Sequence, residues 1–317
     1  MRFLLSTFVS LISVATFAQT TPTTTVTLPP APAAVAPAAQ GDSVIKIKDV
    51  SGNKQFADDK EITDAKMKAD AGSLSKYSLS FSLSYYGPTF GELDAKDQPN
   101  PDGSRGTYET AISGSLGGRY RIDSTQTISV GSGLRAVHPF HGMERVDLNN
   151  PFLSYGIVKR FGNLQMRQSG GVSYITVPNY KVIGEYGSLS YDLATVYNIK
   201  TSPYAIGLDL SLSYFLYDRD YIASDRSASR NSVALYPNFK YNFSDKTSMN
   251  TSLNISFANP RSRADEWALL PKTISQRLGV GYAYTRDIYL SPYVNFFPDK
   301  LSLDRTTINF STVFSLL

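Results

Sequence analysis

The chain has 317 residues, no Cys and a formal net charge of +4 at pH 7, from 31 Lys and Arg against 27 Asp and Glu. The lack of Cys excludes disulfides, thiol chemistry and Cys-based metal sites. So mild and evenly spread a positive charge does not indicate binding to nucleic acid. Tyr is the commonest aromatic residue, with 21 copies, and Tyr favours sites that are apolar at one end and wet at the other.

Residues 1–18 have the pattern of a cleaved signal peptide. Met1-Arg2 gives a short basic start, Phe3 to Phe17 is an apolar run interrupted by Ser and Thr, and a small residue follows at Ala18. A run of about fifteen residues is short for a membrane-spanning helix, which needs about twenty. We therefore expect the chain to be exported and cleaved after Ala18.

Two more segments precede any regular pattern. Residues 19–41 are rich in Thr, Pro and Ala with almost no charge, which predicts an extended linker without a core. Residues 42–75 are predicted to form a periplasmic arm or plug segment. Within it, "SVIKIKDV" predicts one short strand, and "ADDKEITDAKMKADAG" predicts a short helix that stops at Gly72.

From residue 76 to residue 317, large apolar residues alternate with small polar ones, which indicates strands with one apolar face. In "KYSLSFSLSYY", the side chains of Tyr77, Leu79, Phe81, Leu83 and Tyr85 share one face, and Ser residues occupy the other. The same alternation predicts eleven further strands, around residues 108–120, 128–136, 153–161, 164–174, 189–199, 206–216, 233–243, 249–257, 278–284, 288–296 and 308–316.

Three features favour a membrane barrel over a soluble sheet. The strands span about ten to fourteen residues, longer than the five or six usual in soluble proteins and close to the nine to eleven that cross a bilayer. Aromatic residues gather at strand ends, as in the interfacial girdles of such barrels: Tyr77, Tyr85, Tyr108, Tyr120, Tyr155, Phe161, Tyr241, Phe243 and Tyr284. Short turns near residues 123, 162, 201, 245 and 286 alternate with long loops over residues 87–106, 138–150, 177–185, 218–231, 258–272 and 298–304.

Short turns at the periplasmic end and long loops at the outer end are typical of outer-membrane barrels. Over about the last 240 residues, the chain resembles the porin-like class of Gram-negative outer-membrane β-barrel proteins. The resemblance implies an all-β fold, an antiparallel transmembrane β-barrel of about twelve strands over residues 76–317, with an N-terminal periplasmic extension.

That resemblance also implies the surroundings of the protein. The expected location is the bacterial outer membrane, and the expected partners are outer-membrane lipids and lipopolysaccharide. Peptidoglycan, or a periplasmic or surface protein, is a further candidate partner, and neither nucleic acid, a cofactor nor a metal is expected. Loop arginines are candidates for binding lipopolysaccharide phosphates: Arg219, Arg226, Arg261 and Arg263.

The face opposite the large apolar residues is expected to line the barrel interior. The strand phase points nine charged side chains inward: Glu109, Arg119, Arg135, Arg160, Arg167, Asp192, Asp209, Lys240 and Arg277. Six of the nine are basic, and four of these lie near short turns. One interpretation is a basic constriction that favours anionic solutes. The other is internal ion pairing that closes a small barrel.

An acidic cluster precedes the barrel, at Asp58, Asp59, Glu61 and Asp64. One hypothesis is that this cluster meets the basic residues near the short turns and plugs the barrel. The alternative is a solvated helix on a flexible tether. The predicted function is a small passive channel for small polar or anionic solutes. The alternative function is a non-conducting barrel that serves structure or surface interaction and anchors a periplasmic arm.

An enzymatic function, as a lipid-modifying hydrolase, is the least supported hypothesis. His138 and His141 are the only two His, and their spacing lies outside any predicted helix, so it is weak as a metal motif. A catalytic triad would need a Ser beside His138, for which Ser154 is the candidate, together with an orienting acid. We therefore expect both His to lie in a surface loop, and we expect no enzymatic activity.

Overall fold

The structure is a computed structural model that describes residues 62–100, 107–200, 202–218, 228–263, 265 and 267–316. The expected signal peptide, linker and short arm strand lie outside the described residues. So do three members of the acidic cluster, Asp58, Asp59 and Glu61.

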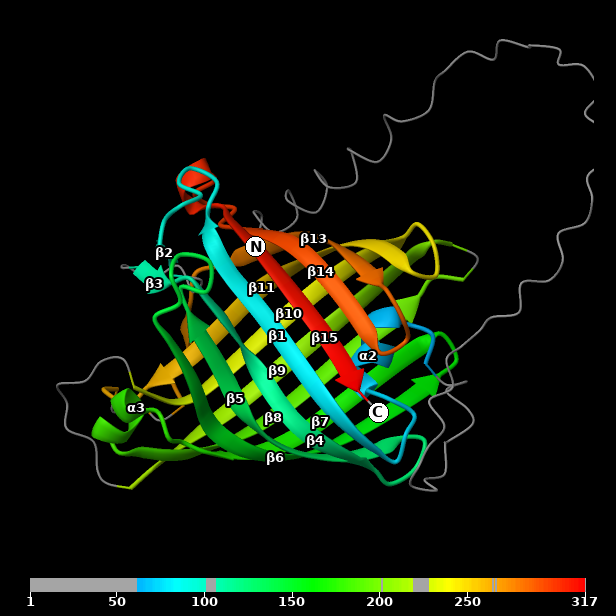
Figure 1. Cartoon of the computed structure of the whole chain (residues 1–317), viewed down its shortest axis with the longest axis horizontal. Helices are drawn as coiled ribbons and strands as arrows, with labels where there is room; N and C mark the ends of the chain where they lie inside the picture. Colours follow the sequence, from blue (N-terminus) through cyan, green and yellow to red (C-terminus); the bar gives the residue numbers. More distant parts are fainter. Residues whose placement is uncertain are drawn as a thin grey trace, which may run out of the picture. The chain divides into compact units, whose positions relative to one another are not determined.

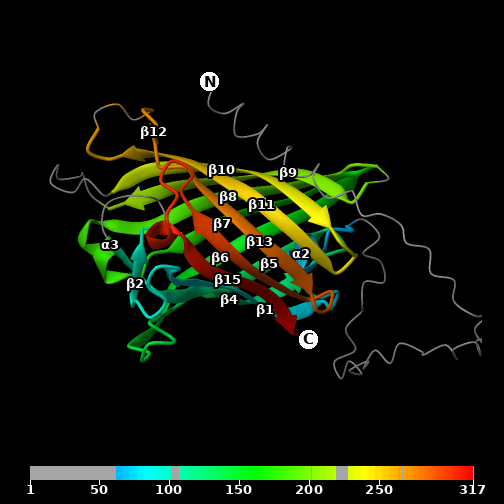
Figure 2. The same cartoon turned by 90° about the horizontal axis from the view of Figure 1, so that it is seen from above.

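One antiparallel sheet forms most of the described chain, and it closes on itself. The strands follow one another around the sheet, β1 pairs with β15, and β10 pairs with β11, which leaves no free edge (Figures 1 and 2). A two-residue strand, β12 (Leu270–Pro271), pairs antiparallel with the end of β11 at Phe257 and Ala258. The barrel wall consists of twelve strands: β1 (Tyr77–Thr89), β4 (Ala111–Arg121), β5 (Gln126–Val137), β6 (Arg145–Phe161), β7 (Leu164–Tyr174), β8 (Glu185–Asn198), β9 (Tyr204–Tyr217), β10 (Ser229–Asn242), β11 (Thr247–Pro260), β13 (Ser275–Ala283), β14 (Ile288–Phe296) and β15 (Thr307–Leu316).

The predicted alternation decides which way the side chains point. Large apolar residues on alternate positions face outward and are exposed, as Val130, Leu153 and Leu189 show with 61%, 51% and 47% of their surface accessible. Their neighbours face the interior, since successive strand residues point to opposite faces. The twelve-stranded antiparallel barrel predicted from the sequence is therefore confirmed.

The end of the barrel that carries the five short turns is called the short-turn end, and the opposite end the long-loop end. At the long-loop end lie α3 (Pro178–Val182), the 3-10 helix η2 (Leu303–Arg305) and a hairpin of β2 (Asp97–Pro99) and β3 (Thr107–Glu109) (Figure 1). In the described part of the chain, no helix has both the length and the apolar character needed to span a membrane.

One predicted loop is shorter in the structure. Residues 145–150 continue β6, which has 17 residues, and only residues 138–144 connect it to β5. The prediction of a loop over 138–150 was wrong because Asn150 and Pro151 interrupt the alternation. Asn150 has a positive φ of 47°, and the pairing with β5 shifts register beside it, between Gly131 and Gly133. A bulge of this kind shifts the phase of the strand without ending it.

Candidate functional site in the barrel lumen

A short helix lies inside the barrel at the short-turn end. α2 (Ala65–Ala71) belongs to residues 62–73, which we call the α2 segment (Figures 1 and 2). Its apolar side chains pack against inward-facing residues from opposite sides of the wall. Met67 belongs to a cluster with Val158 of β6, and Ala69 belongs to another with Tyr289 of β14. Contacts with well-separated strands place the helix within the lumen.

Asp64 fixes the N-terminus of α2 to the wall. Its carboxylate accepts a hydrogen bond from the backbone N–H of Met67 at 3.0 Å, as an N-cap residue does. The second carboxylate oxygen lies 2.6 Å from Nζ of Lys240, with the two side chains 6% and 12% exposed. Asp64 is the member of the predicted acidic cluster that the structure describes, and it contacts one of the predicted inward basic residues.

A buried glutamine holds the chain just before α2. Gln165 of β7 has no accessible surface, and its Oε1 accepts hydrogen bonds from the backbone N–H groups of Thr63 at 2.6 Å and Asp64 at 2.9 Å. Its Nε2 donates to Oγ1 of Thr63 at 2.9 Å. Both polar atoms of the Gln165 side chain therefore form hydrogen bonds with the α2 segment.

The C-terminal end of the α2 segment is held by two arginines. Arg121 of β4 is 3% exposed, and its guanidinium donates to the carbonyl oxygens of Ala71 at 3.1 Å, Gly72 at 3.2 Å and Ser73 at 2.8 Å. Arg286 also donates to the carbonyl of Gly72, at 2.7 Å. These contacts satisfy carbonyls that the end of a helix leaves without intrahelical partners.

Gly72 is required at this turn for two reasons. Its φ is 77°, in the left-handed region that favours glycine. A Cβ atom at this position would lie 1.9 Å from Nη1 of Arg119, so a larger residue would displace that side chain. The predicted stop at Gly72 is confirmed, and Arg119, another predicted inward residue, lies against the helix end.

Charged side chains of α2 also face the lumen. Lys66 and Asp70 form an ion pair at 2.7 Å, and Nη1 of Arg167 lies 3.9 Å from Asp70. Burial alone would raise the pKa of the Asp70 carboxyl, but Lys66 and Arg167 outweigh it and hold that pKa below its ordinary value. The Asp70 carboxylate in turn holds the pKa of Lys66 above its ordinary value. Both groups are therefore ionised at neutral pH.

A cavity of about 410 Å³, which we call the inner cavity, lies beside α2. It brings together five of the predicted inward residues: Arg167, Asp192, Asp209, Lys240 and Arg277. The α2 segment contributes Asp64, Lys66 and Asp70 to the lining. The charges of the described lining residues therefore balance at four acidic and four basic: Asp64, Asp70, Asp192 and Asp209, with Lys66, Arg167, Lys240 and Arg277.

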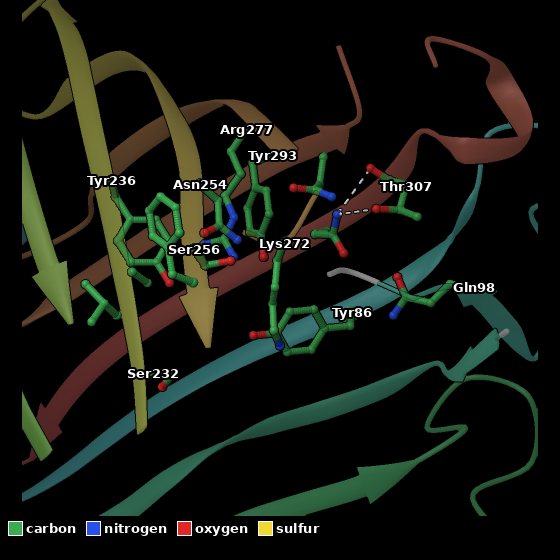
Figure 3. Close-up of a pocket in the computed structure, with 15 residues that line it drawn as sticks. Tyr86, Gln98, Ser232, Tyr236, Asn254, Ser256, Lys272, Arg277, Tyr293 and Thr307 are labelled. Atoms are coloured by element: carbon green, nitrogen blue, oxygen red, sulfur yellow. Dashed lines mark hydrogen bonds between the residues drawn. The ribbon is translucent and has the colours of Figure 1, made fainter. Parts of the chain in front are cut away.

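A second cavity of about 250 Å³, the outer cavity, lies toward the long-loop end. Tyr236, Arg277 and Tyr293 line both cavities, so the two spaces meet at these side chains. Figure 3 shows Arg277 and Tyr293 on one side of the outer cavity and Gln98 on another, with Lys272 between them. The described residues that line it include Lys272 and Arg277 and no Asp or Glu.

The remaining predicted residues lie near the two ends of the barrel. At the short-turn end, Nε of Arg160 donates to the carbonyl of Gly162 at 2.7 Å. At the long-loop end, Glu109 accepts from Arg135 at 3.0 Å and lies 3.5 Å from Arg145.

One prediction for the long-loop end is wrong, and a second one, that loop arginines bind lipopolysaccharide, stays a prediction. Tyr108 was expected in the aromatic girdle, but its hydroxyl accepts from Arg135 at 2.8 Å and its ring packs on that guanidinium. The hairpin of β2 and β3 turns it away from the strand phase. Of the loop arginines, Arg219 and Arg226 lie outside the described residues, and the guanidinium of Arg261 lies 3.8 Å from the ring centre of Tyr217.

Sequence reasoning missed several of the residues that hold the α2 segment. Arg121 lies two positions after Arg119 and therefore points inward by the same alternation. It was overlooked because it ends the strand. Gln165 and Arg286 carry no pattern that separates them from ordinary polar residues near turns, so the sequence offered no means of finding them.

The structure does not assemble the hydrolase triad considered from the sequence. Ser154 pairs with Ser129, nine positions before His138 on β5, which separates Ser154 from His138 by roughly 30 Å along the strand. His138 is 6% exposed, contrary to the expected surface position, and its Nδ1 lies 2.9 Å from Glu144. That contact holds the pKa of Glu144 below its ordinary value. Among the described residues, no group of three or more His, Asp or Glu is arranged to hold a metal.

A closed antiparallel barrel with an apolar outer face and a polar interior defines a class of protein. Only helices and closed barrels satisfy their backbone groups in lipid, and the exposed apolar band on this barrel requires an apolar environment. The chain is therefore a transmembrane β-barrel of the outer-membrane type.

No family model and no curated protein matches the sequence. Among solved structures, the chain is similar to the COG4313 outer membrane channel from Pseudomonas putida F1, with 11% identity, a TM-score of 0.46, and 78% of this chain and 98% of that chain covered. The NanC porin has 10% identity, a TM-score of 0.43 and coverage of 75% and 100%, and the KdgM porin has 9%, 0.41 and 76% and 99%. The class assignment rests on the closed strand register and the polarity of the two faces.

Proposed function

We propose that this protein is a passive channel of the outer membrane for small polar and anionic solutes, and that the α2 segment is a plug at its periplasmic end. The channel is supported by one observation: the inner and outer cavities share three lining residues, Tyr236, Arg277 and Tyr293, so the two cavities lie in series along the lumen. Each of the two cavities is several times the volume of one water molecule, which is enough space for a small solute.

The preference for anions comes from the outer cavity. Arg277 lines it, and none of its described lining residues is acidic. A solute entering from the long-loop end therefore meets positive charge first, which favours anions over cations. The inner cavity has balanced charge while α2 is present, so it adds little further selectivity in the closed state.

The plug is supported by the contacts of the α2 segment. Its N-terminus is held by Lys240 and Gln165, and its C-terminal end by Arg121 and Arg286. A helix with its side chains is about 10 Å across, so it fills much of the interior of a small barrel. The short-turn end, where it lies, is the periplasmic end by the usual arrangement of loops.

A non-conducting barrel is the second candidate function, and the same contacts favour it. Conductance and solute uptake distinguish the two functions. We expect the full mature chain in planar bilayers to conduct intermittently, and the reversal potential in a KCl gradient to indicate preference for chloride. Proteoliposomes should swell in solutions of small neutral sugars more slowly than with an open porin and faster than protein-free liposomes. Absence of both conductance and swelling would support the structural barrel instead.

The ion pair between Asp64 and Lys240 offers a quantitative test of the plug. Asp64→Asn keeps an N-cap residue and removes the charge, and Lys240→Met keeps the chain length and removes the other charge. Each single variant should raise the open probability, because the remaining charge is left in a partly buried site without its partner. The double variant should also raise the open probability, but roughly tenfold less than the product of the two single effects. Independent effects in this double-mutant cycle, measured by single-channel recording, would show that the pair does not hold the plug.

A further inference from the structure

The outer cavity contains buried polar atoms that the protein itself does not satisfy. Gln98, on the β2–β3 hairpin, is 2% exposed, and its Nε2 has no hydrogen-bond partner among the described residues. Oδ1 of Asn254 and Nε of Arg277 are likewise buried without a partner, and all three side chains line this one cavity. Buried polar groups in proteins are almost always paired, so a set of unpaired ones around a cavity indicates a place for a polar ligand.

The charge of the residues that line the outer cavity limits which ligands can bind there. The guanidinium group of Arg277 lies over the ring of Tyr293, with 5.3 Å between the guanidinium carbon and the ring centre. The Nε of Arg277 is buried and has no partner among the described residues, and no described residue of the lining is acidic, so this cationic side chain favours an anion. The Nε edge of an arginine matches the two oxygens of a carboxylate.

The uncharged lining indicates that the anion carries hydroxyl groups. The amides of Gln98 and Asn254 supply a donor and an acceptor, the pair that a hydroxyl group uses at once. Tyr86, Tyr236 and Tyr293 add flat apolar surfaces with polar edges (Figure 3). The volume of about 250 Å³ is several times the space of one water, which suits one small molecule.

We propose that the outer cavity is a binding subsite for a small hydroxylated carboxylate. The carboxylate lies against the Nε edge of Arg277, and its hydroxyl groups form hydrogen bonds with Gln98 and Asn254. This inference rests on the proposed channel for its role, since a weak site near the entrance concentrates one class of solute before it crosses the barrel. Gln98 comes from the hairpin at the long-loop end, so the site is completed by a loop and not by the wall alone.

The test measures binding apart from passage. Isothermal titration of the full mature chain in detergent micelles uses sodium gluconate as the hydroxylated carboxylate and glucose as its neutral counterpart. Gluconate should bind at least tenfold more tightly than glucose. Arg277→Gln should weaken gluconate binding at least tenfold, and Gln98→Ala should weaken it severalfold. Arg263→Gln, which removes the same charge from an exposed loop position outside the cavity, should change it less than twofold.

Equal binding of gluconate and glucose to the unaltered chain, or no binding of either, would overturn the proposal without relying on any variant. So would an Arg263→Gln effect as large as that of Arg277→Gln, because the attraction would then be general surface charge. The two proposals fail separately. If solutes pass but gluconate does not bind, the proposed subsite is wrong and the proposed channel stands. If gluconate binds but solutes do not pass, the proposed channel is wrong.

Discussion

Deletion of residues 19–72 is expected to raise the mean single-channel conductance at least about fivefold, because a helix about 10 Å across no longer occupies the lumen. The deletion removes Asp64, α2 and Gly72, and with them the apolar contacts of Met67 and Ala69 with the wall. The barrel strands begin at Tyr77, so their pairing does not depend on the deleted residues. Planar-bilayer recording of the deleted and unaltered chains measures the change.

A second deletion provides the matched control. Removal of residues 19–41 alone shortens the chain ahead of the barrel but keeps the whole α2 segment. Its conductance should equal that of the unaltered chain. Heat-modifiable migration in gel electrophoresis checks that both variants form the closed barrel. If a correctly folded 19–72 deletion conducts no better than the unaltered chain, the α2 segment does not limit passage and the plug must be abandoned.

Arg121→Ala is expected to raise the open probability of the otherwise unaltered channel by a large factor. The guanidinium of Arg121 donates to three consecutive carbonyls at the end of the α2 segment. Hydrogen bonds to a charged group contribute about 1.5–3 kcal/mol each, and water replaces part of that loss at the mouth. We therefore expect a net change of about 2–4 kcal/mol, which corresponds to roughly 30- to 1,000-fold in the equilibrium between closed and open states.

The control for Arg121→Ala is Lys159→Ala. Lys159 is exposed on β6 near the same end of the barrel and points away from the lumen, next to the inward-facing Val158. The substitution Lys159→Ala removes a positive charge at this end of the barrel without changing any contact of the α2 segment. Open-state conductance should be unchanged in Arg121→Ala, because the variant alters how often the plug leaves and not the pore that remains. Similar open probabilities for the two variants would show that Arg121 does not anchor the plug.

The amino-acid sequence by itself determined the wall of this protein. Alternation with a period of two is a local property, so each strand and the direction of its side chains follow from a dozen neighbouring residues. The closed sheet follows as well, since exposed apolar faces of this length are stable in lipid only when every backbone group is paired. The exceptions arise where local geometry breaks the period, as the bulge beside Asn150 and the hairpin carrying Tyr108 show.

The contents of the lumen were decided only by the tertiary structure. The phase of the strands shows that Lys240 and Arg277 point inward, but not what each side chain meets. Asp64 and Lys240 are 176 positions apart in the sequence, and their contact depends on the stagger of twelve strands around the closed barrel. Gln98 reaches the outer cavity because a loop folds inward, which no period in the sequence predicts. Contacts across a barrel are set by closure, and closure is a property of the whole chain.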